Sequence, residues 1–299
     1  MKILVTGGAG FIASHIVDKY IEAGHDVVIV DNLTTGSKKN INPKAKFYKL
    51  DIRSVKLYEI FKKEKFDIVN HHAAQINLRR SVVEPIYDAD VNIIGSINVL
   101  ENCVKNKVKK IIFASSGGAV YGEPDYLPVD EKHPVAPISP YAVSKFSVEK
   151  YIYSYFINFG LKYTVLRYGN VYGPRQDPRG EAGVIAIFID KMRSGVIPII
   201  NGDGKQLRDY IYVGDIADLN LIVLKKGEND IYNVGTYKGT SVNTLYNELK
   251  KLLNFKKSAE YGPAITGEIY KMYLSAGKVK KALGWSTKVD IKSGLGKTI

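Results

Sequence analysis

The stretch that decides the fold is "TGGAGFIA", residues 6–13. A short apolar run, "KILV", precedes it, and an amphipathic run over residues 11–23 follows. The spacing fits G-x-G-x-x-G/A through Gly8, Gly10 and Ala13, or equally a G-x-x-G-x-x-A frame from Gly7, between an expected strand and an expected helix. Glycines at such a turn let the backbone approach a pyrophosphate, which rests against the positive N-terminal end of the helix. We therefore expect a dinucleotide site here, with Gly7 and Gly10 beside it.

An acidic residue ends the next expected strand. "DVVIVD" spans residues 26–31 and closes on Asp31. At this distance from the glycines, a carboxylate commonly bonds the hydroxyls of the adenosine ribose. The same charge repels a 2′-phosphate, so the sequence favours NAD over NADP.

Strands and helices alternate along the first part of the chain. Apolar runs such as "KFYKLD", "DIVNHHAA", "KKIIFASS" and "KYTVLRYGNVYG" read as further strands, and helices are expected over residues 54–64, 86–106 and from Tyr141 onward. This order predicts parallel βαβ units, an α/β fold with a doubly wound parallel sheet. Ligands of such sheets bind at the carboxyl ends of the strands.

The composition of the sequence changes after residue 168, where Gly, Pro and expected loops become frequent. Shorter helices are expected over residues 181–194, 213–225, 241–253 and 275–283. We interpret this part as a smaller C-terminal α/β lobe that binds the substrate. The predicted division is a cofactor domain of residues 1–168, to which about 210–235 return, and a substrate lobe of residues 169–209 and 236–299.

Composition narrows the function further. The 299 residues carry a net charge of +13, but the lysines occur in short groups mixed with Glu and apolar residues, which indicates solvated surfaces rather than a nucleic-acid site. No signal peptide and no membrane span is expected. With Cys103 as the one cysteine, we expect no disulfide, no metal site and a cytoplasmic location.

The stretch "YAVSK" places two chemically matched side chains one helical turn apart. Tyr141 and Lys145 share a helix face if this stretch is helical. A phenol titrates near pH ~10, and a fixed cation beside it would pull that value toward neutrality, where proton transfer is most effective. Tyr141 is therefore a candidate acid or base.

These stretches, together with "SSGGAVYG", "LRYGNVYGPRQ", "GDGKQLRDYIYVGDIA" and "KALGW", resemble the extended short-chain dehydrogenase/reductases. Within that group, which has a Rossmann fold, the chain is most similar to the UDP-glucose (UDP-galactose) 4-epimerases. The resemblance implies that Tyr141 is the catalytic acid/base and that Lys145 holds the nicotinamide ribose. It also implies a 4-keto intermediate that turns over before the hydride returns to C4. From it we expect these residues at the NAD cofactor: Gly7, Gly10, Phe11, Ile12, Asp31, Asn32, Asp51, Ile52, Ala73, Ala74, Gln75, Asn92, Tyr141, Lys145 and Tyr168.

The third catalytic group departs from the family pattern. Counting back from Tyr121, the usual Ser or Thr hydroxyl falls on Gly117. Ser116, one residue earlier, is our candidate for that hydrogen bond, although a water or the sugar itself would also serve.

On the substrate side, the resemblance points to Asn170 and Arg208 as contacts of the nucleotide sugar, and a guanidinium suits a diphosphate. Met272 falls at the position that gates the sugar, and Ile265 stands where a second phosphate-binding arginine is usual. Tyr168 and a neighbouring tyrosine, Tyr172, are equally consistent with packing between the lobes.

Other functions remain open at this point. The same fold serves UDP-N-acetylglucosamine and UDP-glucuronate 4-epimerases, decarboxylases, dehydratases and reductases. The stretch "SSGGAVYG" lacks the acidic pair that is usual in dehydratases. A non-catalytic NAD-binding protein is the alternative from another class, but it would need neither Tyr141 nor Lys145. Because the helices over 86–106 and 141–159 resemble those that join two subunits in relatives, we expect a homodimer.

Overall fold

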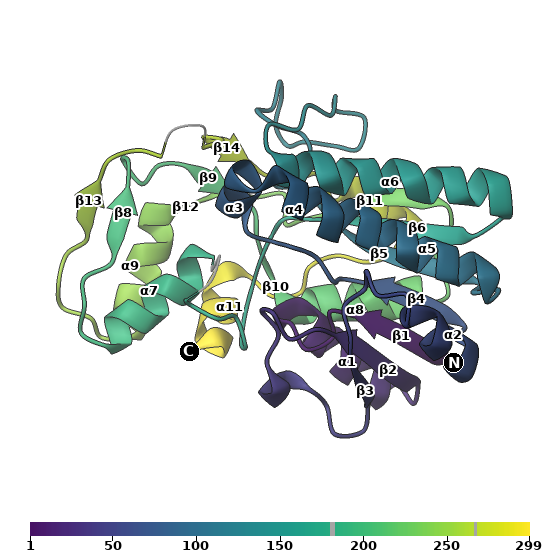
Figure 1. Ribbon diagram of the computed structural model, residues 1–299. Helices are drawn as coiled ribbons and strands as arrows, with labels where there is room; N and C mark the ends of the chain where they lie inside the picture. Colours follow the sequence, from purple (N-terminus) through teal and green to yellow (C-terminus); the bar gives the residue numbers. More distant parts are fainter. Residues whose placement is uncertain (180–182, 266–267) are drawn as a thin grey trace.

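A seven-stranded sheet forms the centre of the larger part of the protein (Figure 1). The computed structural model describes residues 1–179, 183–265 and 268–299. All neighbouring strands are parallel, and their order is β11-β6-β5-β4-β1-β2-β3. The bounds are β1 Lys2–Thr6, β2 Asp26–Asp31, β3 Lys46–Lys49, β4 Ile68–His71, β5 Lys110–Ser116, β6 Lys162–Tyr168 and β11 Asp230–Val234. The order reverses between β1 and β4, which confirms the predicted doubly wound fold.

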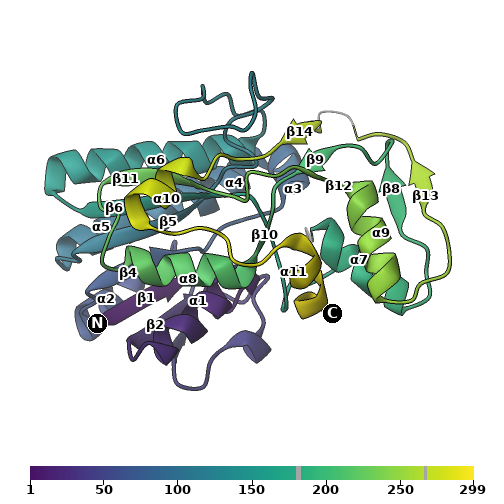
Figure 2. The ribbon, with the colours of Figure 1, turned by 180° about the vertical axis from the view of Figure 1, so that it is seen from behind.

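Helices bury both faces of this sheet, and alternate strand residues contribute to two separate cores. Ile3 and Val5 face a cluster that includes side chains of α1 (Phe11–Glu22) and α8 (Val213–Val223). Leu4, between them, belongs to the opposite cluster, which is completed by α2 (Leu57–Glu64), α5 (Gly95–Lys105) and α6 (Pro140–Phe159). Figure 2 shows α1 and α8 side by side over their face of the sheet. Burial on both faces explains why the strands read as continuous apolar runs.

The helix expected over residues 86–106 is continuous but irregular. It consists of α4 (Pro85–Ala89), a π-helical turn over Asp90–Ile94, and α5. A further helix, α3 (Leu78–Val83), was not predicted; the side chain of Asn77 accepts a hydrogen bond from the N–H of Arg80 and caps its start. Because π turns are rare and often occur at functional sites, the residues on this turn are candidates for a functional role.

A smaller lobe lies beyond the end of the sheet that is opposite the N-terminus (Figure 1). Its helices are α7 (Val184–Arg193), α9 (Val242–Leu252) and α11 (Ile291–Thr298), which share a third apolar core. Residues 181–182, where a helix was expected to begin, lie outside the described residues. The remaining elements are a 3₁₀ turn Lys38–Asn40, β7 Asn170–Tyr172, β8 Ile199–Asn201, β9 Leu207–Arg208, β10 Tyr210–Tyr212, β12 Thr240–Ser241, β13 Glu260–Gly262, β14 Lys271–Met272 and α10 Gly277–Leu283. The exact division into two domains stays a proposal.

Asp209, between β9 and β10, joins the lobe to the edge of the sheet. Its side chain is buried, and its carboxylate accepts hydrogen bonds from the backbone N–H of Thr236 (2.9 Å) and of Leu274 (3.0 Å). Burial raises the pKa of Asp209 to about 6, and the hydrogen bonds from Thr236 and Leu274 partly oppose this rise. One side chain thus anchors the segments that follow β11 and β14.

An ion pair lies fully inside the sheet domain. Arg167 of β6 pairs with Glu149 of α6 at 2.6 Å, and both side chains are at most 4% exposed. Glu149 also accepts a hydrogen bond from the hydroxyl of Ser115, and Arg167 donates one to the hydroxyl of Tyr121. The pair therefore fixes α6 against β5 and β6, the strands beneath the expected catalytic residues.

Two further findings concern membranes and metals. Across the three described ranges, no helix has both the length and the apolar character needed to cross a bilayer. The same ranges contain no group of three or more His, Cys, Asp or Glu side chains placed to hold a metal ion.

We predict that Arg167→Met lowers the free energy of unfolding by about 3–5 kcal/mol, because it leaves the Glu149 carboxylate buried without its partner. Urea denaturation measures this loss. The matched control is Lys162→Met on the same strand, whose pair with Glu228 is exposed; it should change the free energy of unfolding by less than about 1 kcal/mol. Equal losses in the two variants would contradict the prediction.

Candidate active site

The glycine turn lies at the point where the strand order reverses. Gly7 has a positive φ of 72°, and a Cβ there would lie 2.7 Å from the backbone nitrogen of Ala73. The segments after β1 and β4 therefore meet closely because Gly7 has no side chain. Helix α1 begins directly afterwards at Phe11. Its first N–H groups have no partner within the helix and carry the positive end of its dipole, so the turn can receive a pyrophosphate.

Asp31 lies at the end of β2, beside this turn. Its carboxylate accepts hydrogen bonds from the N–H of Ala9 (3.0 Å) and of Leu33 (2.7 Å). Burial raises the pKa of Asp31, and these two hydrogen bonds partly counteract the effect. The backbone thus positions an acid where the sequence predicts the ribose hydroxyls to bind.

The neighbouring strand ends carry the other residues expected at the adenosine. The amide of Asn32 donates to Asp51 at 2.9 Å, and Arg53 pairs with the same carboxylate at 2.8 Å. Hydrogen bonds from Arg53 lower the pKa of Asp51 well below its usual range. Ile52 is buried and packs against Gly95 at the start of α5. Hydrogen bonds from Asn32 and Arg53 therefore hold the Asp51 carboxylate in place, beside the buried Ile52.

After β4, the chain passes Ala73 and Ala74 and reaches Gln75, which is paired with Asn92. The N–H of Gln75 donates to the side-chain oxygen of Asn92 at 2.8 Å, and the amide of Asn92 returns a bond to the carbonyl of Gln75 at 3.0 Å. Asn92 lies in the π turn. The structure thus brings together two of the residues predicted at the cofactor, although both are largely buried.

Tyr141 and Lys145 lie in the first turns of α6, as expected. Ser139 caps the helix, because its side chain accepts a hydrogen bond from the N–H of Ala142. Lys145 is 5% exposed. Its ammonium donates to the carbonyl of Ala114 at 2.9 Å and lies 5.8 Å from the ring centroid of Tyr141. The two side chains therefore share one face at the carboxyl end of β5.

The acidities of these groups differ from the expectation. Burial raises the pKa of Tyr141 to about 12, and a hydrogen bond with Ser116 only partly lowers it. Burial likewise lowers the pKa of Lys145 to about 8. In the protein by itself, desolvation of the phenolate outweighs any help from the neighbouring cation. Ser116 lies within hydrogen-bond reach of the phenol, and its catalytic role stays a prediction.

The unusual glycine at position 117 has a packing reason. A Cβ there would lie 2.5 Å from a methyl group of Leu274 and 3.0 Å from the carbonyl oxygen of Arg167. Leu274 belongs to a buried cluster with Val120 and Met272. An apolar side chain therefore fills the space that a serine at this position would need.

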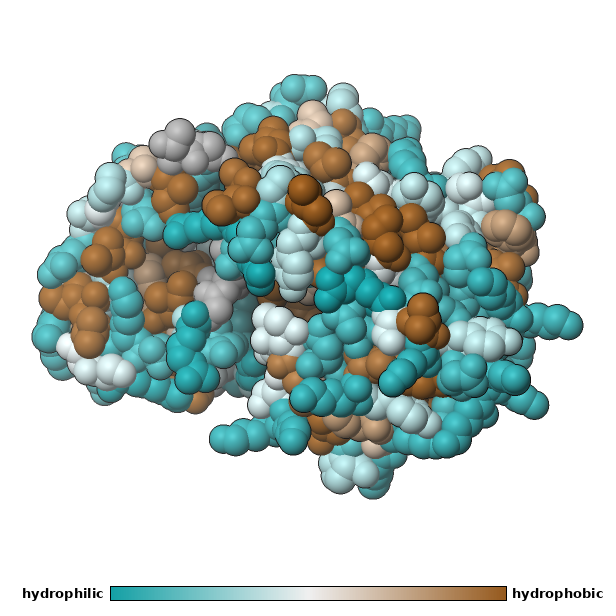
Figure 3. Space-filling model, in the orientation of Figure 1, coloured by the Kyte–Doolittle hydropathy of each residue, from teal (hydrophilic) through white to brown (hydrophobic). Residues whose placement is uncertain are grey.

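The predicted substrate residues belong to three short strands, β7, β9 and β14. Figure 3 shows a hollow in the surface between the larger part of the protein and the lobe. Asn170 is exposed, and its side-chain oxygen lies close to Gly118. Arg208 of β9 forms an ion pair with Glu268 at 2.7 Å. Met272 of β14 lies opposite Arg208 where the two strands pair. Met272 is buried, and residues 266–267 lie outside the described residues.

Two tyrosines of the predicted set lie within cores. The ring of Tyr168 stacks on His72 at 5.9 Å, and its hydroxyl accepts a hydrogen bond from Asn220 at 2.9 Å. Tyr172 is buried in the lobe core, and its hydroxyl lies against Gly294 of α11. Both rings are packed, but Tyr168 lies in the core of the sheet domain and Tyr172 in that of the lobe, rather than between the two.

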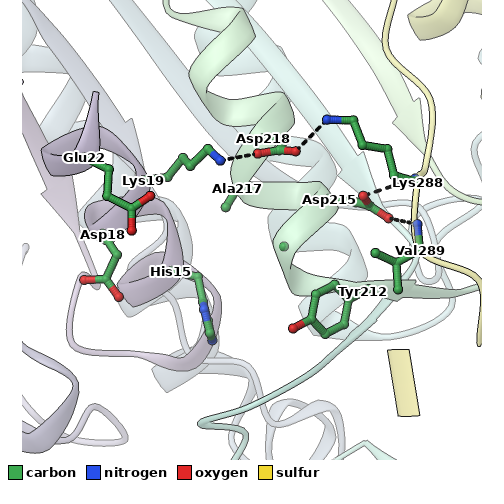
Figure 4. A pocket seen from close by; sticks show the side chains of 11 residues that line it. His15, Asp18, Lys19, Glu22, Tyr212, Asp215, Ala217, Asp218, Lys288 and Val289 are labelled. Carbon is green, nitrogen blue, oxygen red and sulfur yellow. Dashed lines mark hydrogen bonds and ion pairs between the residues drawn. The ribbon is translucent and has the colours of Figure 1, made fainter. Parts of the chain in front are cut away.

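A separate cavity of about 330 Å³ lies between α1 and α8 (Figure 4). Its charged side chains are largely paired: Asp218 binds Lys19 at 2.6 Å and Lys288 at 2.9 Å. Asp215 accepts the N–H of Val289 at 3.1 Å. The cavity is on the opposite face of the sheet from Tyr141, so it does not belong to the site described above.

Comparison with known proteins identifies the family. Residues 3–235 match the family described as "NAD dependent epimerase/dehydratase family". The chain belongs to the NAD dependent epimerase/dehydratase family. Its cofactor is NAD, in agreement with Gly7, Asp31 and the helix start at Phe11.

Three known proteins are similar to this chain over nearly their whole length. A Methanocaldococcus jannaschii protein, provisionally assigned as a UDP-glucose 4-epimerase, is 54% identical and covers 99% of this chain and 97% of its own. The Thermotoga maritima UDP-glucose 4-epimerase with UDP-glucose has a TM-score of 0.98 at 48% identity, with 100% and 97% coverage. The Thermus thermophilus UDP-glucose 4-epimerase in complex with NAD has a TM-score of 0.95 at 40% identity, with 100% and 97% coverage.

Residue-by-residue reading missed several groups that shape this site. Asp88 and Glu149 are buried carboxylates close to Lys145, and Leu274 lies against Gly117 from far along the chain. Glu149 follows Lys145 by four residues on one helix face, a spacing that the sequence displays. The position of Leu274 depends on tertiary packing alone, and nothing local in the sequence indicates it.

We predict that Gly117→Ser lowers the free energy of unfolding by about 1–3 kcal/mol, because the new side chain overlaps Leu274. Leu274→Ala alone should cost about 2–5 kcal/mol through the cavity it creates. The double variant should lose less than the sum of the two, since each change relieves the other. Chemical denaturation of the four proteins measures the coupling, and strict additivity would show that the contact is unimportant.

Proposed function

We propose that this NAD-dependent enzyme interconverts UDP-glucose and UDP-galactose at C4 of the sugar. The observation that carries the proposal is the placement of Tyr141, Lys145 and Ser116 at the carboxyl end of β5, across from the glycine turn. The relatives whose names state this activity support the choice of sugar.

Each residue has a distinct part in the proposed mechanism. Tyr141 takes the proton from the sugar O4, and later returns it to the reoriented 4-keto sugar. Ser116 hydrogen-bonds the phenol, and Lys145 holds the nicotinamide ribose with its ammonium. NAD supplies the acceptor and donor of hydride at C4. Helix α6 keeps the three groups fixed relative to the end of the sheet, so little reorganisation precedes proton transfer.

The nucleotide part of the substrate would bind between β9 and the end of β6. We assign Arg208 to the diphosphate and Asn170 to the sugar side. Arg208 is held by Glu268 and by the carbonyl of Leu207 at 2.9 Å, so its guanidinium is already oriented. With Ile265 in place of a second arginine, Arg208 carries more of the phosphate charge than in the usual pattern of the family.

The other reactions of this fold fit less well. A dehydratase would need an acidic pair near Ser116, whereas Gly117 and Gly118 occupy the following positions. A non-catalytic NAD-binding protein would have no use for an aligned tyrosine and lysine. UDP-N-acetylglucosamine and UDP-glucuronate epimerisation use the same residues, and only product analysis separates them.

The test is incubation of the purified protein with UDP-glucose, UDP-N-acetylglucosamine or UDP-glucuronate without added NAD, followed by separation of the products. We expect UDP-galactose from UDP-glucose, with no lasting change in nicotinamide absorbance. A persistent rise in absorbance would indicate a net dehydrogenase. No product from any of the three donors would contradict the proposed activity.

We predict that Tyr141→Phe lowers kcat at least about 10²-fold and leaves NAD bound, because only the proton-transferring hydroxyl is removed. Product formation and the NAD content after gel filtration measure the two effects. The matched control is Tyr153→Phe, an exposed tyrosine of the same helix, which should retain its kcat. Full turnover by Tyr141→Phe would refute the assigned role.

We also infer that the enzyme is a homodimer that works in the cytoplasm. Apolar side chains are exposed along α4, the π turn and α6, and Figure 3 shows apolar groups scattered over the surface of the larger part of the protein. They are Ile86, Ile94, Val143, Tyr151, Tyr153, Ile157 and Phe159. The single cysteine, Cys103, is buried and unpaired, as is common in a reducing compartment.

We predict that Ile157→Asp shifts the protein from dimer to monomer in analytical ultracentrifugation, because a carboxylate would be buried in the interface. Tyr261→Asp, at an equally exposed position in the lobe, should leave the dimer intact. A monomeric wild-type protein, or an unchanged dimer in Ile157→Asp, would argue against this surface.

A further inference from the structure

The most deeply buried carboxylate near the catalytic helix belongs to Asp88 of α4, which is 0% exposed. It accepts three hydrogen bonds: from the amides of Gln75 (2.8 Å) and Asn92 (3.0 Å) on one oxygen, and from the hydroxyl of Ser144 (2.6 Å) on the other. All three donors are neutral. Because no arginine or lysine pairs with this buried carboxylate, its negative charge is not neutralised locally. The charge therefore acts on other groups nearby.

Each of the three donors is a predicted site residue or is next to one in the sequence. Gln75 and Asn92 are residues expected at the cofactor, and Asp88 sets the orientation of both side-chain amides. Ser144 immediately precedes Lys145 on α6. Asp88 thus connects the segment after β4, the π turn and the catalytic helix, which come from separate parts of the chain.

The ammonium of Lys145 lies within the field of this carboxylate. Asp88 is the strongest influence that opposes the effect of burial on Lys145, ahead of Glu149. Glu149 is itself neutralised by Arg167 at 2.6 Å. The other titratable groups around Lys145 are Tyr141 on the same helix and, at the end of β4, His71 and His72. Burial and the charge of Lys145 lower the pKa of both histidines to about 3, so both are neutral at pH 7.

We propose that Asp88 is a positioning residue of the active site, whose negative charge keeps Lys145 cationic and whose oxygen atoms orient Gln75 and Asn92 toward the cofactor. The proposal rests on the proposed function for its consequence in catalysis, but not for its electrostatics. Asp88 acts through Lys145 and the two amides and touches no reacting atom.

The substitution Asp88→Asn separates charge from hydrogen bonding. The asparagine oxygen can accept from Gln75 and Asn92, and its amide can donate to the hydroxyl of Ser144, which accepts as readily as it donates. Ser144→Ala is the reverse control, because it removes one hydrogen bond and keeps the charge. Lys110 is an internal control, because burial also lowers its pKa to about 8. Its ammonium donates hydrogen bonds to the backbone carbonyls of Val223 and Lys226 instead of lying near Asp88.

The test is an NMR pH titration of the Cε signals of protein labelled with ¹³C-lysine, with the Lys145 signal assigned through Lys145→Met. In the wild type, Lys145 and Lys110 should both titrate near pH 8. In Asp88→Asn, the midpoint of Lys145 should fall by about one unit while that of Lys110 stays unchanged. Ser144→Ala should leave both midpoints in place.

An unchanged midpoint of Lys145 in Asp88→Asn, or an equal fall in Ser144→Ala, would overturn the proposal. If Asp88→Asn does not fold, the wild type still decides the matter. A Lys145 midpoint below pH 7 would show that Lys145 is not kept cationic, and it would refute the proposal. None of these measurements needs a sugar nucleotide. They can therefore contradict the role of Asp88 while the epimerase activity is confirmed, or support that role while the activity is absent.

Turnover adds a second readout. A negative charge raises the pKa of both neighbours, Tyr141 and Lys145. The pH profile of kcat in Asp88→Asn should therefore move as a whole by about one unit toward acid, with both limbs displaced in the same direction. A purely structural role would lower kcat without moving the limbs, and that result would contradict the proposal.

Discussion

The close approach of two backbone segments at Gly7 and Ala73 is the constraint on which the site depends. It occurs where β1 pairs with β2 on one side and with β4 on the other, so the crossovers leave in opposite directions. A side chain at Gly7 would hold these segments apart. Because they meet, the free N–H groups of α1, the acid of β2 and the residues after β4 converge on one crevice.

Polar groups inside the sheet domain form distinct networks rather than isolated contacts. Between the sheet and α1, the amide of Asn70 donates to Tyr20 (2.7 Å) and to Asn220 (2.9 Å). On the other face, Glu149 and Arg167 form their ion pair. Such networks add less stability than apolar packing of equal volume, but a shifted helix would leave their members unsatisfied. The first network therefore specifies where α1 and α8 lie relative to the strands, and the second where α6 lies.

The sequence predicted the elements of this fold well where local patterns determine them. Continuous apolar strands, the glycine turn and the face shared by Tyr141 and Lys145 all depend on near neighbours in the chain. The short strands of the lobe, two or three residues each, have too few positions to show a period. The pKa of Tyr141 could not be predicted either, because desolvation depends on groups brought together by tertiary packing. The same holds for Leu274, whose contact with Gly117 joins residues from distant parts of the chain.

The anchor at Asp209 has a mechanical consequence. Its two carboxylate oxygens hold the backbone at Thr236, beside the last strand of the sheet, and at Leu274, behind the end of β5. Leu274, which lies against Gly117, is thus held by the same carboxylate as the backbone after the last strand. Loss of this one carboxylate would therefore release both backbone segments at once.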